Sequence, residues 1–116
     1  MSEIQNRRIF RVNRFAVPVE GREEFMALVH RTHKVIRAQP GFVDDLILEQ
    51  ASSAGLFNVI TILQFEGEHA LQPVIAAVAK SDEEAGIDRQ ALSRRLGVET
   101  NVGFYHRAVL QELQPA

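Results

Sequence analysis

Four segments of the chain are rich in β-branched and aromatic residues whose apolar positions recur at every second residue, and in the third segment both faces are apolar. In the first segment Phe10 and Val12 fall on one face, while Ile9 and Phe15 fall on the other. A period of two is typical of strands, because successive side chains point to opposite faces of a sheet. The pattern predicts strands over residues 9–17, 42–50, 56–65 and 98–110.

Between the first two predicted strands the apolar period lengthens to three or four residues, which indicates an amphipathic helix over residues 20–39. Pro40 and Gly41 end this helix, because proline cannot continue it and glycine accepts a left-handed turn. A second helix is predicted over residues 67–80, and it either begins just before Pro73 or bends there.

A further helical piece is predicted after the second helix. Residues 81–84 have the capping-box pattern of a helix start, and Gly97 ends the piece. The order strand, helix, strand, strand, helix, strand is the split βαβ pattern of an α+β, ferredoxin-like fold with an antiparallel sheet. Helices would cover one face of that sheet, and the other face carries too many apolar residues to face water. The pattern therefore predicts a homodimer in which two such faces stack.

The composition fits one small globular domain. With 116 residues, we expect a single domain over residues 1–116 with its core at about 8–110. The formal net charge of -2 gives no electrostatic footprint for nucleic acid or an anionic membrane. The absence of cysteine excludes disulfides, thiolate nucleophiles and cysteine-based metal sites.

The polar start lacks the features of a secretory signal, and no apolar stretch is long enough to span a membrane, so we expect a cytoplasmic protein.

Several short segments, in a consistent order, carry a family resemblance. They are Val-Asn-Arg-Phe at 12–15, Glu-Gly at 20–21, Gln-Pro-Gly-Phe at 39–42 and Phe-Asn-Val-Ile-Thr at 57–61. Over roughly residues 8–106 the chain resembles the antibiotic biosynthesis monooxygenase family. The resemblance implies a dimeric α+β barrel with a pocket between the sheet and the helices of each subunit. It also implies a cofactor-independent monooxygenase that oxidises a small aromatic or quinol-like molecule with O2.

Two positions keep other functions open. Family members commonly carry a tryptophan where the third strand runs into the second helix, whereas this chain has Phe65 there and no tryptophan at all. That difference favours a non-catalytic dimer that binds a small aromatic ligand. Asn13 matches a first-strand asparagine of the related branch that degrades haem, but residues 71–96 lack the histidine that this branch uses as axial ligand. We expect no cofactor, with haem as the alternative.

Three polar residues are candidates for catalysis. Asn58, among apolar neighbours in a predicted strand, could hold a substrate anion, or it could bond to a neighbouring strand or lie at the end of the sheet. His69, just after a turn from strand to helix, could act as general base or lie at the surface. His106 shares a face with Phe104 and could take a proton in the pocket, or it could be a core or interface histidine.

Four further residues are candidates for substrate contact: Asn13, His33, Phe65 and Phe104. The resemblance implies Asn13, and Phe65 would form an apolar wall in the place of the usual tryptophan. His33 borders the apolar stripe of the first helix, whereas His30 does not. A metal site would need a third ligand beyond these two histidines, and the sequence offers none at a recognisable spacing, so we expect no metal.

Overall fold

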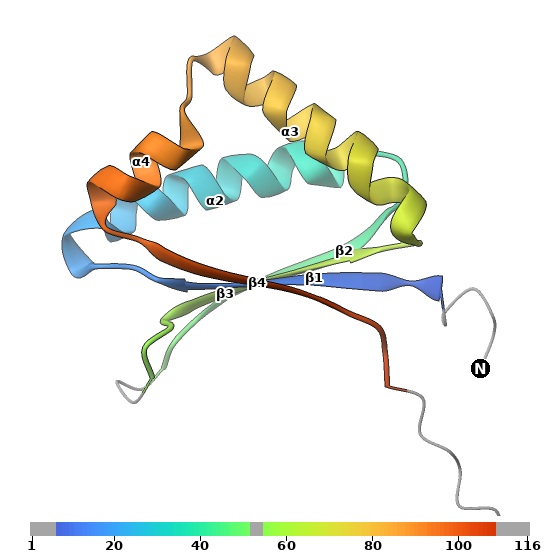
Figure 1. Ribbon diagram of the computed structural model, residues 1–116, viewed down its shortest axis with the longest axis horizontal. Helices are drawn as coiled ribbons and strands as arrows, with labels where there is room; N and C mark the ends of the chain where they lie inside the picture. Colours follow the sequence, from blue (N-terminus) through green and yellow to red (C-terminus); the bar gives the residue numbers. More distant parts are fainter. Residues whose placement is uncertain (1–6, 52–54, 109–116) are drawn as a thin grey trace, which may run out of the picture.

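The computed structural model describes residues 7–51 and 55–108, which contain four strands and three α-helices (Figure 1). The strands are β1 (Ile9–Ala16), β2 (Phe42–Glu49), β3 (Val59–Phe65) and β4 (Glu99–Tyr105), and the helices are α2 (Arg22–Arg37), α3 (Leu71–Ala85) and α4 (Arg89–Leu96). Short 3-10 turns precede α2 at Val19–Gly21 and α3 at Glu68–Ala70. All strand pairs are antiparallel, and the order across the sheet is β2-β3-β1-β4.

This arrangement confirms the predicted ferredoxin-like fold. The units β1-α2-β2 and β3-α3-α4-β4 each supply one central and one edge strand, so the two units interleave in a single sheet. At the centre of the sheet Asn13 lies opposite Thr61 on β3 and Val102 on β4. Residues 109–110, the predicted end of the last strand, lie outside the described residues.

The helix after β3 begins four residues later and ends five residues later than the predicted range 67–80, and the predicted capping box was wrong. Helix α3 runs through residues 81–84, which form its last turns and do not start a new helix. The break comes at Gly86, where φ is 69°, and Asp88 then caps α4 by accepting a hydrogen bond from the N–H of Ala91. Pro73 lies in the first turn of α3, where its missing N–H would have no partner within the helix. None of the described helices has the length and hydropathy needed to cross a membrane.

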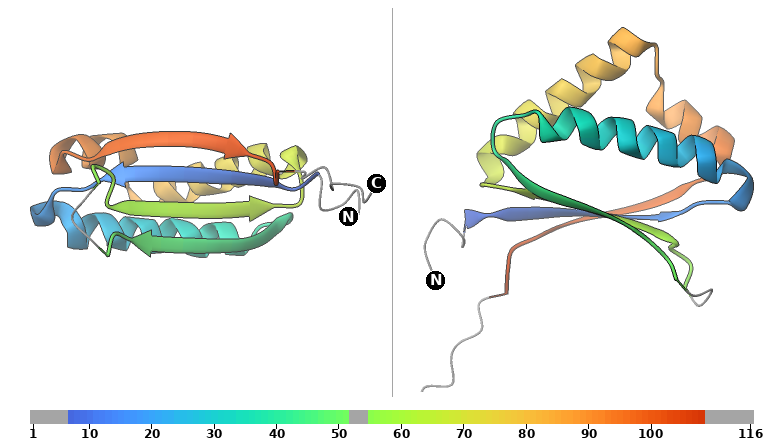
Figure 2. Two further views of the ribbon diagram at one scale, coloured as in Figure 1. Left: turned by 90° about the horizontal axis from the view of Figure 1, so that it is seen from below. Right: turned by 180° about the vertical axis from the view of Figure 1, so that it is seen from behind.

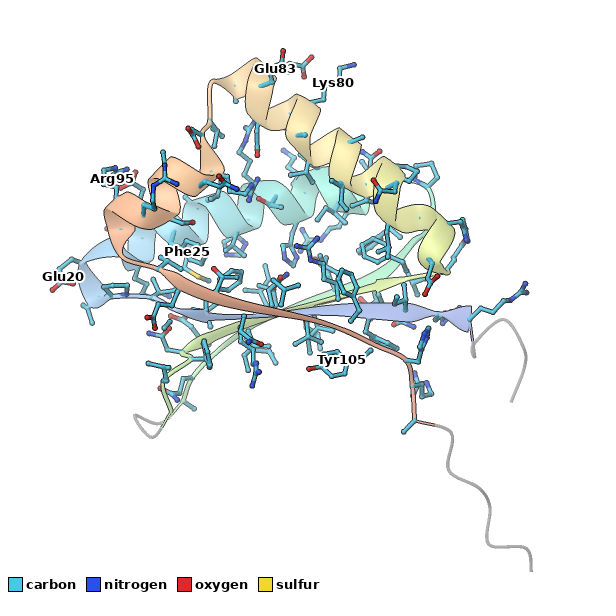
Figure 3. All side chains as sticks on the ribbon, viewed as in Figure 1. Glu20, Phe25, Lys80, Glu83, Arg95 and Tyr105 are labelled. Atoms are coloured by element: carbon cyan, nitrogen blue, oxygen red, sulfur yellow. The ribbon has the colours of Figure 1, made fainter. Side chains whose placement is uncertain are left out.

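All three helices lie on one face of the sheet, with α2 over β2 and β3 and with α3 and α4 over β1 and β4 (Figure 2). Two apolar clusters fill the space between the layers: Ile9, Ile36, Leu63, Phe65, Ala70 and Val74 in one, and Val17, Phe25, Met26, Val29 and Val59 in the other. Phe25 points from α2 toward the sheet (Figure 3). Between the two clusters lie three buried polar side chains, Asn13, His33 and Thr61.

No described helix covers the opposite face of the sheet, on which Tyr105 projects away from the helices (Figure 3). We call this surface the open face, and its apolar members are Phe10, Val12, Leu46, Leu48, Ile60, Ile62 and Tyr105. Leu46 is 53% exposed and Tyr105 is 51% exposed. Val12, Ile62 and Leu46 lie opposite one another on three adjacent strands. The uncovered apolar face predicted from the sequence is therefore present.

The turn after α2 brings the start of β2 close to the end of β3. Gly41 has a φ of 87°, in the left-handed region that favours glycine. Its carbonyl accepts a 2.8 Å hydrogen bond from the N–H of Glu66. A Cβ atom added at Gly41 would lie 2.6 Å from the Cβ of Ala70, closer than two such atoms can approach. Glycine is therefore required here both by the backbone conformation and by the packing.

Candidate functional site

A cavity of about 1120 Å³ lies between the helix-covered face of the sheet and the three helices. Its apolar wall consists of Phe15, Phe25, Leu28, Val29, Ile36, Leu63, Phe65, Leu71, Val74, Ile75, Val78, Ala79, Ile87 and Val102. A large apolar cavity with a few convergent polar groups is the usual form of a small-molecule site. The polar groups of this cavity come from the centre of the sheet, from α2 and from α4.

Three polar side chains, Arg11, Asn13 and Thr61, form a hydrogen-bonded polar strip on the sheet side of the cavity. The side-chain Nδ2 of Asn13 donates to Oγ1 of Thr61 at 3.2 Å, and Oδ1 of Asn13 accepts from Nε of Arg11 at 3.4 Å. Asn13 is 9% exposed and Thr61 is 2% exposed, so these contacts fix the direction of the amide. One N–H of Asn13 and the two terminal nitrogens of Arg11 have no hydrogen-bond partner among the described residues.

His33 on α2 and Asp45 on β2 form a hydrogen-bonded pair beside this strip. Nδ1 of His33 lies 2.8 Å from Oδ2 of Asp45, and Nε of Arg37 donates to the same oxygen at 2.9 Å. His33 is 3% exposed and lines the cavity. Within the part of the chain that the structure describes, Nε2 of His33 has no hydrogen-bond partner, and this atom is not completely buried. This nitrogen is therefore available to a molecule in the cavity.

The protonation states follow from the surroundings of the pair. Burial lowers the pKa of His33 below its usual value and outweighs the opposing hydrogen bond to Asp45. Burial would raise the pKa of Asp45, but the hydrogen bonds from Arg37 and His33 lower it overall. Because an ionised carboxylate only accepts, neutral His33 donates through Nδ1–H and keeps a lone pair on Nε2. A carboxylate-oriented imidazole of this kind is suited to act as general base.

Arg89, the first residue of α4, connects the three helices by hydrogen bonds to α3 and α2. Its Nε and Nη2 donate to the two carboxylate oxygens of Asp82 at 3.0 and 2.9 Å, and its Nη1 donates to Oγ1 of Thr32 at 2.9 Å. Burial, and secondarily the charge of Arg89, lower the pKa of Arg11. Arg11 and Arg89 both line the cavity, and the carboxylate of Asp82 balances the charge of Arg89.

The structure places three of the four predicted substrate contacts in the wall of this cavity, namely Asn13, His33 and Phe65. Phe65, at the end of β3, is 1% exposed. Phe104 is not a lining residue, but its ring centroid lies 5.7 Å from the guanidinium carbon of Arg11. The substrate-binding roles of these four residues stay predictions.

Asn58 lies outside the cavity and outside β3, which begins only at Val59, so its predicted position within the strand was wrong. Its amide oxygen accepts from the N–H of Val17 at 2.9 Å, and its amide nitrogen donates to the carbonyl of Val17 at 2.8 Å. These contacts join the end of β1 to the start of β3. They match the alternative considered from the sequence, an amide bonded to a neighbouring strand at the end of the sheet.

His69 and His106 also lie outside this cavity, so the prediction that His106 faces the pocket between sheet and helices was wrong. Strand β4 ends at Tyr105, and the alternation used to place His106 stops there. Both histidines are exposed and line a separate hollow of about 680 Å³ with Arg7, Arg8 and Glu66, among others. Nδ1 of His106 lies 3.2 Å from the carbonyl oxygen of Arg8. Neither histidine lies in the cavity that holds His33.

The sequence did not single out three residues that line the cavity, Arg11, Thr61 and Arg89, or Asp45, which contacts His33 from β2. Alternation along β1 places Arg11 on the face of Asn13, and alternation along β2 turns Asp45 away from Asp44, so both signals were available. Arg89 gave no such signal, because its position depends on how three helices meet.

The sequence matches no protein-family model and no curated protein. A variant of SnoaB, a cofactor-independent oxygenase from Streptomyces nogalater, has a TM-score of 0.67 with 24% identity over 91% of this chain and 99% of that one. A candidate antibiotic biosynthesis monooxygenase from Nitrosomonas europaea has a TM-score of 0.65 with 12% identity over 98% of both chains.

The chain has the fold of the antibiotic biosynthesis monooxygenases. A third structure, a candidate monooxygenase from Shewanella loihica, agrees with a TM-score of 0.64, 17% identity and coverage of 89% of this chain and 96% of that one. The fold of the single chain that the sequence resemblance implies is thereby confirmed, and the dimeric barrel stays a prediction. At these identities the similarity is one of fold, and the chemistry must be argued from the residues of the cavity.

The residues present do not fit haem in the manner of the haem-degrading branch. That resemblance requires an axial histidine from the second helical region, and the described helices α3 and α4 contain none. The histidine that lines the cavity, His33, comes from α2 and is already bonded to Asp45. In residues 7–51 and 55–108 no group of three or more histidine, cysteine, aspartate or glutamate side chains is placed to hold a metal ion.

Proposed function

We propose that this protein is a cofactor-independent monooxygenase that oxidises a small aromatic or quinol-like molecule with O2 in the cavity between sheet and helices. The observation that carries the proposal is His33, whose Nδ1 is fixed by Asp45 while Nε2 stays available. A cofactor-free reaction with O2 begins with loss of a proton from the substrate, and this pair supplies a base inside an apolar cavity.

An aromatic ketone with an acidic CH2 group, such as anthrone, is a suitable substrate for this reaction. Nε2 of His33 removes one methylene proton, and the electron pair stays on the substrate as an enolate. The enolate passes one electron to O2, and the radical and superoxide combine into a carbon–oxygen bond. Protonation gives a hydroperoxide, which loses water together with the second methylene proton. The sum is CH2 + O2 → C=O + H2O, and all four electrons accepted by O2 come from the substrate.

Asn13 is positioned to stabilise the enolate. Asn13 lines the cavity, and its amide is held by Thr61 and Arg11, which leaves one N–H without a partner among the described residues. A donor that is already oriented loses little energy to reorganisation when the negative charge forms, and the apolar wall strengthens its effect by excluding water. Asn13 therefore takes the donor role that the sequence analysis gave to Asn58.

The functional unit in this proposal is a homodimer that buries the open face. The fold leaves Leu46, Leu48 and Tyr105 each more than two-fifths exposed on that face. A contiguous apolar surface of this kind is unfavourable in water, and stacking two copies through a two-fold axis would remove it.

Oxygen consumption tests the proposed reaction. Anthrone is added to the purified protein in buffer that contains a metal chelator, O2 is followed with an electrode, and anthraquinone is measured by its absorbance. We expect one O2 consumed for each anthraquinone formed, well above the rate without protein. A rate equal to that of the buffer alone, with this and related acidic aromatics, would refute the monooxygenase.

A non-catalytic ligand-binding dimer is the second candidate function. The observation that favours it is Phe65, which stands in the wall of the cavity where the family commonly has tryptophan. It predicts that small aromatics raise the melting temperature without any uptake of O2. The two candidates are separated by running thermal shift and oxygen electrode measurements on the same ligands.

A further inference from the structure

Arg11 brings a positive charge into the cavity beside the polar side chain of Asn13. It projects from β1 on the helix-covered face, it is half-buried, and no ion pair joins it to an acidic residue among those described. Its contacts are the amide oxygen of Asn13 and the ring of Phe104. A half-buried charge left unpaired is costly, and an anionic ligand would remove that cost.

The other charges around the cavity are balanced or lie at its rim. Arg89 is paired with Asp82, Asp45 is paired with Arg37, and His33 is neutral at neutral pH. The remaining charged lining residues, Glu83, Asp88 and Arg94, are exposed, so water and salt screen them. The interior therefore has an excess of one positive charge, which matches a monoanion.

We propose that the cavity selects an aromatic substrate that carries a carboxylate, and that Arg11 binds this carboxylate through its two free terminal nitrogens. The inference rests on the proposed function, since it names the substrate class of the same site. A guanidinium group presents parallel N–H donors that match a carboxylate, which gives orientation as well as charge recognition. The lowered pKa of Arg11, caused by burial and then by Arg89, agrees with a group that lacks a counter-charge.

The placement of Arg11 and His33 also bounds the shape of the ligand. Arg11 is on β1 and packs against Phe104 on β4, whereas His33 is bonded to Asp45 on β2, and β3 lies between β1 and β2. Neighbouring strands lie about 4.8 Å apart, so a ligand that reaches both residues must extend across the sheet. A flat system of two or more fused rings meets this requirement, with its carboxylate at Arg11 and its reactive carbon toward His33.

Calorimetric titration of the full chain with 2-naphthoate and with the neutral 2-naphthamide tests the inference. These two probes share a ring system and differ in charge, and neither carries the acidic CH2 group needed for oxidation. We expect the wild-type protein to bind the acid at least about tenfold more tightly than the amide, because a charge-assisted bidentate contact replaces a neutral one. Arg11→Gln should abolish that preference.

Arg14→Gln is the matched control. Arg14 lies on the same strand and also packs against a ring, that of Phe57, but it projects from the opposite face, so its loss should keep the preference for the acid. If Arg11→Gln does not fold, Arg11→Met replaces it, because methionine keeps an apolar stem without a buried polar end. Equal binding of acid and amide, a preference that survives loss of Arg11, or no binding of either probe would overturn the inference. None of these outcomes depends on O2, so they are separate from failure of the oxygen electrode test.

Discussion

Nδ1 of His33 and Oδ2 of Asp45 lie 2.8 Å apart, on a helix and a strand that are connected by the tight turn at Pro40 and Gly41. The turn folds β2 back beneath α2, which brings two residues only 12 positions apart into direct contact. The contact has a chemical consequence, because the carboxylate fixes which ring nitrogen carries the proton. Neutral His33 therefore keeps its lone pair on Nε2, which is the atom that would act as base in the proposed reaction.

Replacement of His33 tests this assignment directly. His33→Gln should lower kcat for O2 uptake by about 100-fold or more, since general base catalysis contributes on that order. Asp45→Asn should also lower kcat, because the amide cannot stabilise the protonated imidazole. His30→Gln is the matched control, since His30 lies on the same helix but is exposed. A His33→Gln protein that keeps wild-type kcat would show that the base lies elsewhere.

The lowered pKa of His33 predicts how stability depends on pH. The unfolded chain binds a proton at its histidines below about pH 6.5, whereas folded His33 resists protonation. The stabilising contribution is therefore complete above about pH 6.5 and is lost as the pH falls toward the lower pKa of the folded state. Urea unfolding at several pH values from 7.5 down to about 5 measures this slope. This pH range lies above the one in which carboxylates titrate. His33→Gln should flatten the slope and His30→Gln should not. An unchanged slope in His33→Gln would contradict the assignment.

The contacts of Asn58 predict a structural role. Asn58→Ala leaves the N–H and carbonyl of Val17 without their side-chain partner and should lower the free energy of unfolding by about 1–3 kcal/mol. At a temperature where the variant is folded, its kcat should equal that of the wild type. Asn101→Ala, at an exposed amide that accepts from Arg14, should change stability much less. A drop in kcat without loss of stability would instead support the catalytic role predicted from the sequence.

Local periodicity was sufficient to predict the fold, because the strands and α2 are defined by which face of each element is apolar. It was not sufficient at residues 81–84, where a capping pattern lies inside a helix. There Arg31 on α2 donates to the carbonyl and hydroxyl oxygens of Ser81, and this long-range contact supports the continued helix. The same limit applies to the site. Asn13 and His33 could be placed by the face on which they lie, whereas Arg89 meets Thr32 across 57 positions of sequence.

The open face predicts a dimer that a single charge disrupts. Leu46 is 53% exposed and lies opposite Ile62 on that face, so Leu46→Glu should leave the monomer folded while placing a charge in the proposed interface. The dissociation constant, measured by sedimentation equilibrium, should rise by about 100-fold or more. Val19→Glu is the control, because Val19 is 86% exposed in the turn before α2 and lies outside the sheet. A wild-type protein that is monomeric at micromolar concentration would refute the dimer.

Gly41 and Gly86 allow the effect of backbone conformation to be separated from that of packing. Both have positive φ, at 87° and 69°, so replacement of either by alanine should cost about 1–2 kcal/mol in the left-handed region. A Cβ at Gly86 meets no atom within 4 Å, whereas a Cβ at Gly41 lies 2.6 Å from that of Ala70. Gly41→Ala should therefore destabilise the protein clearly more than Gly86→Ala in urea unfolding. It should also lower activity, because the same turn carries β2 and Asp45 to His33. If the two variants lose the same free energy of unfolding, the contact between this turn and Ala70 does not constrain the start of β2.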